Sequence, residues 1–126
     1  MSRKHSREKA FQVLFQIDIN PNSTPDQLIQ AMDEDLSDFA NQLINGVLEQ
    51  KVELDQAISE NLDHWSFSRI GTVEKTLLRI AVFEMKYVEE IPEKVSINEA
   101  VELAKRFHDE QSGKFINGVL SKFIRS

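Results

Sequence analysis

The sequence predicts an all-α fold, a compact bundle of six or seven helices. Apolar residues recur at three- and four-residue spacing along most of the chain, breaker residues fall between those segments, and no stretch alternates convincingly like a strand. A chain of 126 residues is near the commonest size of one domain. We therefore expect a single domain over 1–126, made of two packed helical subdomains at about 1–63 and 64–126.

Three or four helices are expected before residue 64. The first ends at the breaker cluster 20–23, and its apolar face consists of Ala10, Phe11, Leu14 and Ile17. Thr24 then has the position of an N-cap and Pro25 that of a first helical turn, so a short helix should follow through Met32. A third helix, and either a fourth or a continuation of the third, are indicated by Phe39, Leu43, Val47, Leu48, Leu54, Ile58 and Leu62.

Residues 64–68 interrupt the periodicity and contain two aromatic side chains, Trp65 and Phe67. We expect both aromatics to fill the seam between two helical groups, which makes this connector the best internal boundary. The following segment, 73–85, is apolar nearly all round a helix. A helix of that kind belongs at the centre of the fold.

The last two helices carry their own start signals. Ser96 and Glu99 match a capping box and predict a helix start, and Ser112 can cap the last helix. Gly118 lies inside that last helix, where an interior glycine predicts the close approach of another helix. The expected inner faces consist of Ile97, Ala100, Val101, Ala104 and Phe107, and of Phe115, Ile116, Val119, Leu120 and Phe123.

Composition argues against several enzyme classes. Cysteine is absent, so the chain has no disulfide, thiolate nucleophile or cysteine-ligated metal. Its four glycines are scattered, and His108, Asp109 and Glu110 are explained more simply as a polar helix-end turn than as metal ligands. We expect no catalytic residues, no metal and no cofactor. No apolar run is long enough for a membrane span, so we expect a cytoplasmic protein that does not bind membranes.

Charge is unevenly distributed along a chain whose net charge is -6. Residues 11–63 contain one lysine against 11 acidic residues, whereas residues 1–10 contain Arg3, Lys4, Arg7 and Lys9. A basic start on an acidic body suits a local anionic partner such as RNA phosphate. A solvated helix start would have the same composition, so this signal leaves both interpretations open.

A second candidate surface lies at the start of the last helix. Lys114 stands beside Phe115, and Gln111 adds a polar side chain. A cation next to an aromatic ring is typical of surfaces that bind single-stranded RNA. The spacing of Phe115 equally fits the core stripe of its helix.

Several segments, in order over nearly the whole chain, resemble the NusB family. The N-terminal and central segments are Arg7-Glu8-Lys9-Ala10, Leu14-Phe15-Gln16, Arg69-Ile70-Gly71-Thr72-Val73-Glu74-Lys75 and Leu78-Arg79-Ile80-Ala81. The C-terminal hallmark consists of Ile97-Asn98-Glu99-Ala100-Val101-Glu102-Leu103-Ala104-Lys105-Arg106-Phe107, Ser112 and Lys114-Phe115-Ile116-Asn117-Gly118-Val119-Leu120.

This resemblance implies two packed helical subdomains and a transcription antitermination factor. Such a factor binds the boxA sequence of nascent RNA with ribosomal protein NusE, and acts with RNA polymerase and other Nus factors to promote transcription of ribosomal RNA operons. The RNA-binding residues implied for this chain are Arg3, Lys4, Arg7, Gln111, Lys114 and Phe115. The residues implied for NusE binding are Glu74, Val95 and Glu99.

Two positions depart from the family pattern. Gln111 stands where an acidic residue is common, and Glu93 stands where an aromatic or apolar residue is common. Two other functions stay open at this point: a protein-only helical scaffold, and a free-standing relative of the RNA-binding module of ribosomal RNA cytosine methyltransferases. A homodimer is a further alternative.

Overall fold

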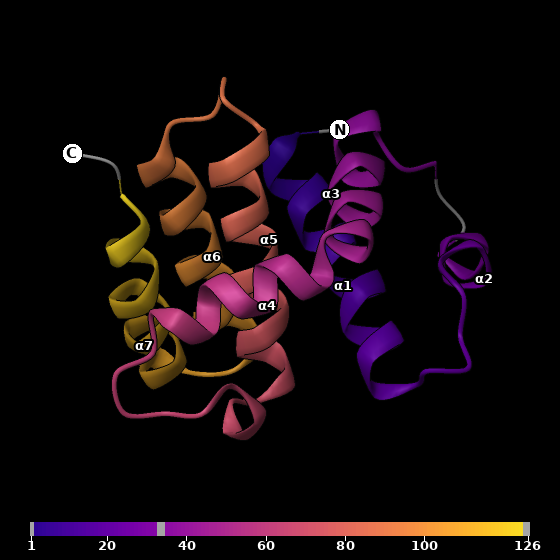
Figure 1. Ribbon diagram of the computed structural model, residues 1–126. Coiled ribbons are helices and arrows are strands. Elements are labelled where there is room, and N and C mark those ends of the chain that lie inside the picture. Colours follow the sequence, from indigo (N-terminus) through magenta and orange to yellow (C-terminus); the bar gives the residue numbers. More distant parts are fainter. Residues whose placement is uncertain (1, 33–34, 125–126) are drawn as a thin grey trace.

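The computed structural model describes residues 2–32 and 35–124, and within these ranges it contains seven α-helices, two short 3₁₀ helices and no strand. This confirms the predicted all-α fold (Figure 1). The elements are α1 (Arg3–Ile19), α2 (Pro25–Ala31), α3 (Asp38–Glu49), α4 (Lys51–Glu60), η1 (Phe67–Arg69), α5 (Thr72–Tyr87), α6 (Glu93–Phe107), α7 (Glu110–Leu120) and η2 (Ser121–Phe123).

Helix α5 lies at the centre of the bundle, as its all-round apolar pattern predicts. It contacts α1, α3, α4, α6 and α7, and residues 76–85 are all buried. Its one buried arginine, Arg79, donates hydrogen bonds to Asp55 of α4 and Asp18 of α1. Burial alone would lower the pKa of Arg79, but the hydrogen bonds and charges of the two aspartates outweigh it and raise the pKa. Arg79 therefore ties α1 and α4 to the central helix.

The remaining helices form groups on either side of α5. Helices α1, α2 and α3 lie on one side, and α6 and α7 lie on the other, with α4 crossing in front (Figure 1). Helix α4 packs mainly against α5 rather than against α3. Helix α4 belongs to the predicted first subdomain by sequence, but it packs mainly on α5, which belongs to the predicted second one. The predicted division into two subdomains near residue 63 therefore stays a prediction.

Two of the three predicted helix starts are wrong. Helix α6 begins at Glu93 with Pro92 as its N-cap, so Ser96 lies inside the helix, where its hydroxyl donates to Glu84 of α5. Helix α7 is capped by Asp109, whose carboxylate accepts the Ser112 backbone N–H at 2.8 Å. The start of α2 is confirmed: Thr24 caps it and forms a capping box with Gln27.

The close approach predicted at Gly118 is also wrong, since a Cβ added there would meet nothing within 4 Å. The close approach occurs at Gly46 of α3 instead. A Cβ at Gly46 would lie 2.1 Å from Cζ of Phe83, so the absence of a side chain allows α3 to pack on α5. Within the described part of the chain, no helix combines the length and apolarity of a membrane span.

Candidate nucleic-acid interface

The first turn of α1 presents two exposed cations. The side chains of Arg3 and Lys4 are 53% and 63% exposed, and their nearest carboxylates are 4.0 Å away on Glu90 and 3.9 Å away on Glu99. Ion pairs that long and that exposed hold a side chain weakly. Both cations are therefore available to an anionic ligand, and their predicted contact with RNA stays a prediction.

The structure places Arg7 differently from Arg3 and Lys4. Arg7 is 3% exposed, and its Nε and Nη2 donate to the two carboxylate oxygens of Glu84, both at 2.8 Å. Ser96 donates a third hydrogen bond to the same carboxylate. The Arg7 guanidinium is thus committed to a buried ion pair that joins α1, α5 and α6, which argues against the predicted direct contact with RNA.

A surface groove of about 500 Å³ lies where the connector before α5 meets the start of α7. It contains the three residues predicted at the last turn, Gln111, Lys114 and Phe115. The other lining residues are Trp65, Arg69, Ile70, Gly71, Glu74, His108, Asp109 and Ser112. We call this set of residues the connector groove.

An aromatic pair lines the connector groove. Trp65 is 60% exposed, and its ring meets the half-buried ring of Phe115 edge to face, with centroids 6.3 Å apart. Phe67 alone packs against the core, so the prediction that both connector aromatics fill the seam is wrong for Trp65. Phe115 packs against the core, as its helical stripe predicted, and it also lines the groove; its role in RNA binding stays a prediction.

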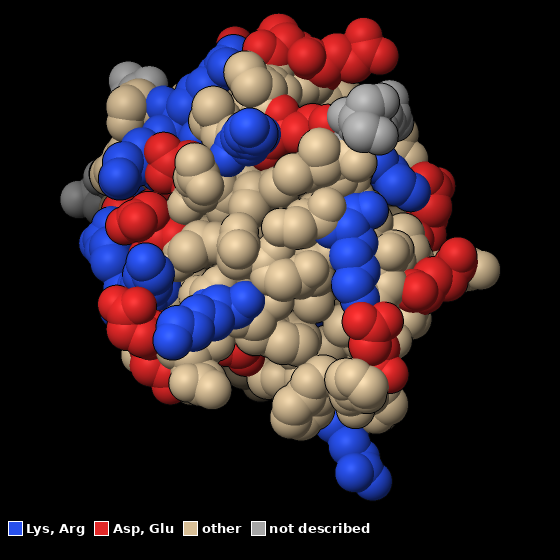
Figure 2. Space-filling model, turned by 90° about the vertical axis from the view of Figure 1, so that its left-hand side faces the viewer, with Lys and Arg blue, Asp and Glu red and all other residues tan. Residues whose placement is uncertain are grey.

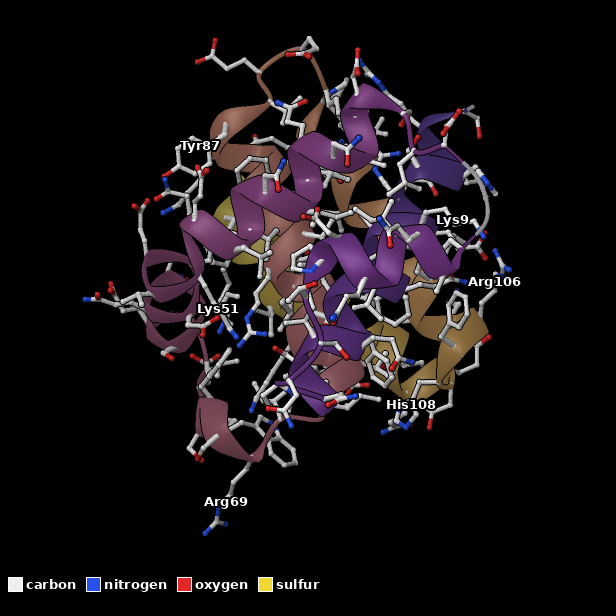
Figure 3. The ribbon with its side chains drawn as sticks, turned by 90° about the vertical axis from the view of Figure 1, so that its right-hand side faces the viewer. Lys9, Lys51, Arg69, Tyr87, Arg106 and His108 are labelled. Carbon is white, nitrogen blue, oxygen red and sulfur yellow. The ribbon has the colours of Figure 1, made fainter. Side chains whose placement is uncertain are left out.

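Two cations of the connector groove, Arg69 and Lys114, have no acidic partner in the part of the chain that the structure describes. Among residues 2–32 and 35–124, no carboxylate lies within 4.0 Å of the Arg69 guanidinium or the Lys114 ammonium. Figure 3 shows the Arg69 side chain reaching away from the ribbon into solvent. Arg69 was not predicted from the sequence; an arginine outside every helical stripe, close to an aromatic, was the available signal.

The floor of the connector groove is polar and internally paired. Glu74 is 8% exposed; its carboxylate accepts the Ser112 hydroxyl and lies 3.0 Å from Nδ1 of His108. The predicted capping role of Ser112 is replaced by this contact. The floor therefore joins the start of α5 to the start of α7 and fixes the groove between them.

A charged edge runs between the N-terminal turn and the connector groove. Figure 3 shows Lys9 and Arg106 on this edge, with Tyr87 on the opposite side of the view. Arg106 pairs with Glu8 of α1 at 2.6 Å. Figure 2 shows the face of α6 and α7, where uncharged surface fills much of the centre and basic side chains lie around it, many of them beside acidic ones.

The three predicted partner-binding residues do not lie together. Val95 is 41% exposed near the start of α6, and Glu99, one turn later, contacts Lys4 of the N-terminal turn. Glu74 is buried in the floor of the connector groove. The structure therefore groups Val95 and Glu99 with the N-terminal turn, and Glu74 with the predicted RNA-binding residues of α7. Across the described residues, no group of three or more acids and histidines could hold a metal ion.

Comparison with known proteins identifies similar chains of the same length. The model of the NusB family matches residues 4–125. The chain is 50% identical over 125 residues to the transcription antitermination protein NusB of Oceanobacillus iheyensis, covering 98% of this chain and 99% of the relative. It is 49% identical over 122 residues to the protein of the same name from Bacillus subtilis, covering 96% of this chain and 93% of that one.

Solved structures agree with this result. The fold is similar to T. maritima NusB with a TM-score of 0.88 and 34% identity, over 97% of this chain and 89% of that chain. It is also similar to a chain in a crystal structure of the antitermination factors NusB and NusE in complex with double-stranded RNA. There the TM-score is 0.84 and the identity 31%, over 95% of this chain and 93% of that chain.

Proposed function

The chain belongs to the NusB family, and on that premise we propose that it binds boxA-type single-stranded RNA together with ribosomal protein NusE. In this role it acts as a transcription antitermination factor that promotes processive transcription of ribosomal RNA operons, joining RNA polymerase through other Nus factors. The observation that carries the proposal is the connector groove, where unpaired cations stand beside exposed aromatic surface. Stacking and charge together are what a single strand of RNA requires.

The two basic regions suit one RNA strand that runs along the charged edge. Lys4 contacts Glu99, nine residues before His108 of the connector groove, which corresponds to roughly 13 Å along a helix. Arg3 and Lys4 at one end and Lys114 at the other would contact phosphates, while Phe115 would contact a base. Arg7 serves this interface indirectly, because its buried pair with Glu84 fixes the turn that carries Arg3 and Lys4.

Ribosomal protein NusE is proposed to bind beside the RNA, at Val95 and Glu99. Val95 offers exposed apolar surface, and the pairing of Glu99 with Lys4 makes this surface continuous with the RNA-binding turn. A NusE-bound relative of the same fold, in complex with RNA, supports the combination of partners. Because the proposed NusE site adjoins the N-terminal turn, NusE bound there would lie next to the RNA, and this position gives a physical reason for NusE to increase the affinity for RNA.

The test is RNA binding by the Arg3→Ala/Lys4→Ala variant, measured by fluorescence anisotropy with a labelled boxA-type RNA, with and without NusE. We expect weaker RNA binding and unchanged thermal stability, because both side chains are exposed. Lys86→Ala removes a cation near the C-terminal end of α5 that pairs with Glu53 of α4 instead of contacting the N-terminal turn, and it serves as the control that should bind normally. Equal affinity of the double variant and the control would overturn the proposal; NusE binding without any RNA binding would favour a protein-only scaffold instead.

A further inference from the structure

We infer that Trp65 and Arg69, on the connector before α5, form a nucleobase-stacking subsite in which one RNA base stacks on the Trp65 ring and Arg69 contacts the adjacent phosphate. The inference rests on the proposed RNA-binding function and extends it to two residues of the connector groove for which that proposal names no RNA contact. It follows from three features of the connector: its exposed aromatic ring, its unpaired cation and its fixed backbone.

The Trp65 ring is largely open to solvent. It is 60% exposed, whereas an indole in a helical protein would ordinarily bury most of its large apolar surface. Phe115 meets it in a T-shaped contact rather than stacked in parallel on it, so another planar ring can use the exposed indole surface. Because every base has such a planar face, a base is the complementary ligand.

The connector groove offers two cations to an anion beside Trp65, while its two acids, Glu74 and Asp109, lie within 4.0 Å of His108. Arg69, four residues after Trp65, and Lys114, one residue before Phe115, line the same groove, and neither has a carboxylate within 4.0 Å among the described residues. In contrast, Arg79 and Arg106 have acidic partners at 2.6 Å. An aromatic face flanked by unpaired cations is complementary to a base and its phosphate together.

The connector is held in place before any ligand binds. The Phe67 ring, between Trp65 and Arg69 in sequence, packs against the core with Lys75 and Arg79 at 5.1 and 5.5 Å from its centroid. Ile70 is buried, and Lys122 pairs with Asp63 at 2.5 Å on the other side of Trp65. Because the connector is anchored on both sides of Trp65, less conformational entropy of its backbone is lost when a ligand binds. Trp65 and Arg69 are therefore presented to solvent by a backbone that is already in place.

Trp65 is the only tryptophan of the chain, so its fluorescence reports on this subsite alone. We expect titration of the full-length protein with boxA-type RNA to quench that fluorescence. An oligomer of abasic ribose phosphate with the same length and charge should leave it nearly unchanged, since it offers no ring to stack. Quenching of equal size by both oligomers would assign the effect to charge and would overturn stacking.

Variants separate the two parts of the subsite by RNA anisotropy. Trp65→Ala should weaken RNA binding by about 5- to 150-fold, as expected for one stacked base, and Trp65→Phe should restore much of the loss. Arg69→Ala should lower the slope of log affinity against log salt by about 0.7, the value for one phosphate contact on a single strand. Tyr87→Ala and Lys86→Ala remove an exposed aromatic and a cation from the opposite side of the molecule, and should bind RNA normally.

The outcomes distinguish this inference from the proposed function. If the wild type binds RNA but Trp65→Ala and Arg69→Ala bind like the two controls, the subsite is wrong and the function stands. If the wild type binds no RNA, with or without NusE, both are wrong. Quenching of Trp65 by an acidic peptide in place of RNA would also overturn the inference, because the groove would then be a protein-docking site.

Discussion

Arginines of similar sequence context have different roles in this protein, as Arg3 and Arg7 demonstrate. Both belong to the basic start of α1, and both approach the Phe39 ring, at 5.3 and 5.4 Å. Only Arg7 stands three and four residues before Ala10 and Phe11, on the stripe that faces the core. Charge counting therefore located the basic turn correctly, but it did not separate an exposed cation from a buried one. The acid Glu84, inside the most apolar helix, was the sequence signal of a buried partner.

Replacing Arg7 with alanine should destabilise the fold by about 3–5 kcal/mol, because it leaves the Glu84 carboxylate buried without a counter-charge. Urea denaturation measures the change. Arg7→Met combined with Glu84→Leu should recover part of the loss, since removing both charges also removes the desolvation cost. A loss of RNA affinity in Arg7→Ala at unchanged stability would show instead that Arg7 contacts RNA directly.

The exposed pair of Lys122 and Asp63 gives a prediction on pH. The hydrogen bond from Lys122 and then its charge hold the pKa of Asp63 below its ordinary value. A lowered carboxyl pKa contributes stability above the unfolded pKa, and that contribution is lost as pH falls through the folded pKa. In an NMR titration, Lys122→Ala should therefore move the Asp63 midpoint upward, and Lys86→Ala should leave it unchanged; an unmoved midpoint in both would rule out the pair.

Among the elements, helices were predictable and two of their starts were not. Periodicity indicated the helical segments, because an amphipathic stripe is a property of local sequence, but it left open whether α3 and α4 are one helix or two. Ser96 and Ser112 were misassigned as caps because both hydroxyls donate to buried acids of α5, Glu84 and Glu74. A serine at a cap and a serine that bonds across helices look alike until the neighbouring helix is placed. A capping residue can be recognised from the local sequence. A distant carboxylate that takes the serine hydroxyl as its hydrogen-bond donor cannot.

The two interior glycines provide an opposed pair of substitutions. Gly46→Ala should destabilise the fold by about 1–3 kcal/mol, because its Cβ would collide with the Phe83 ring. Gly118→Ala should stabilise it by roughly 0.5–1 kcal/mol, since the added methyl meets open space and alanine favours the helix. Thermal denaturation of both variants is the measurement. Shifts of the same sign would contradict the packing described for one of them.

For the whole molecule, the fold and part of the interface could be predicted, whereas the connector groove could not. Lys114 and Phe115 were recognisable because they are neighbours in sequence. Trp65 and Arg69 join them only through the packing of α7 beside the connector, some 50 residues away in sequence. A site assembled from distant segments depends on tertiary structure. Sequence patterns can identify individual residues of such a site, but they do not show which of these residues lie together.

The net charge of -6 makes RNA binding by the whole protein a local event with a measurable salt dependence. Each phosphate contact on a single strand contributes about 0.7 to the slope of log affinity against log salt. Removal of Arg3 and Lys4 together should therefore reduce the slope by about 1.4. Anisotropy titrations across a range of potassium chloride concentrations test this; an unchanged slope would mean that neither side chain contacts phosphate.

The bond between Arg7 and Glu84 also bears on the order in which the chain is made. The two residues are 77 positions apart, so α1 leaves the ribosome long before α5, the helix that carries Glu84. Until α5 has been synthesised, Arg7 lacks its counter-charge, and the first turn of α1 lacks its anchor. That turn is thus fixed only after the centre of the bundle has emerged, and the surface that it carries forms late in the life of the nascent chain.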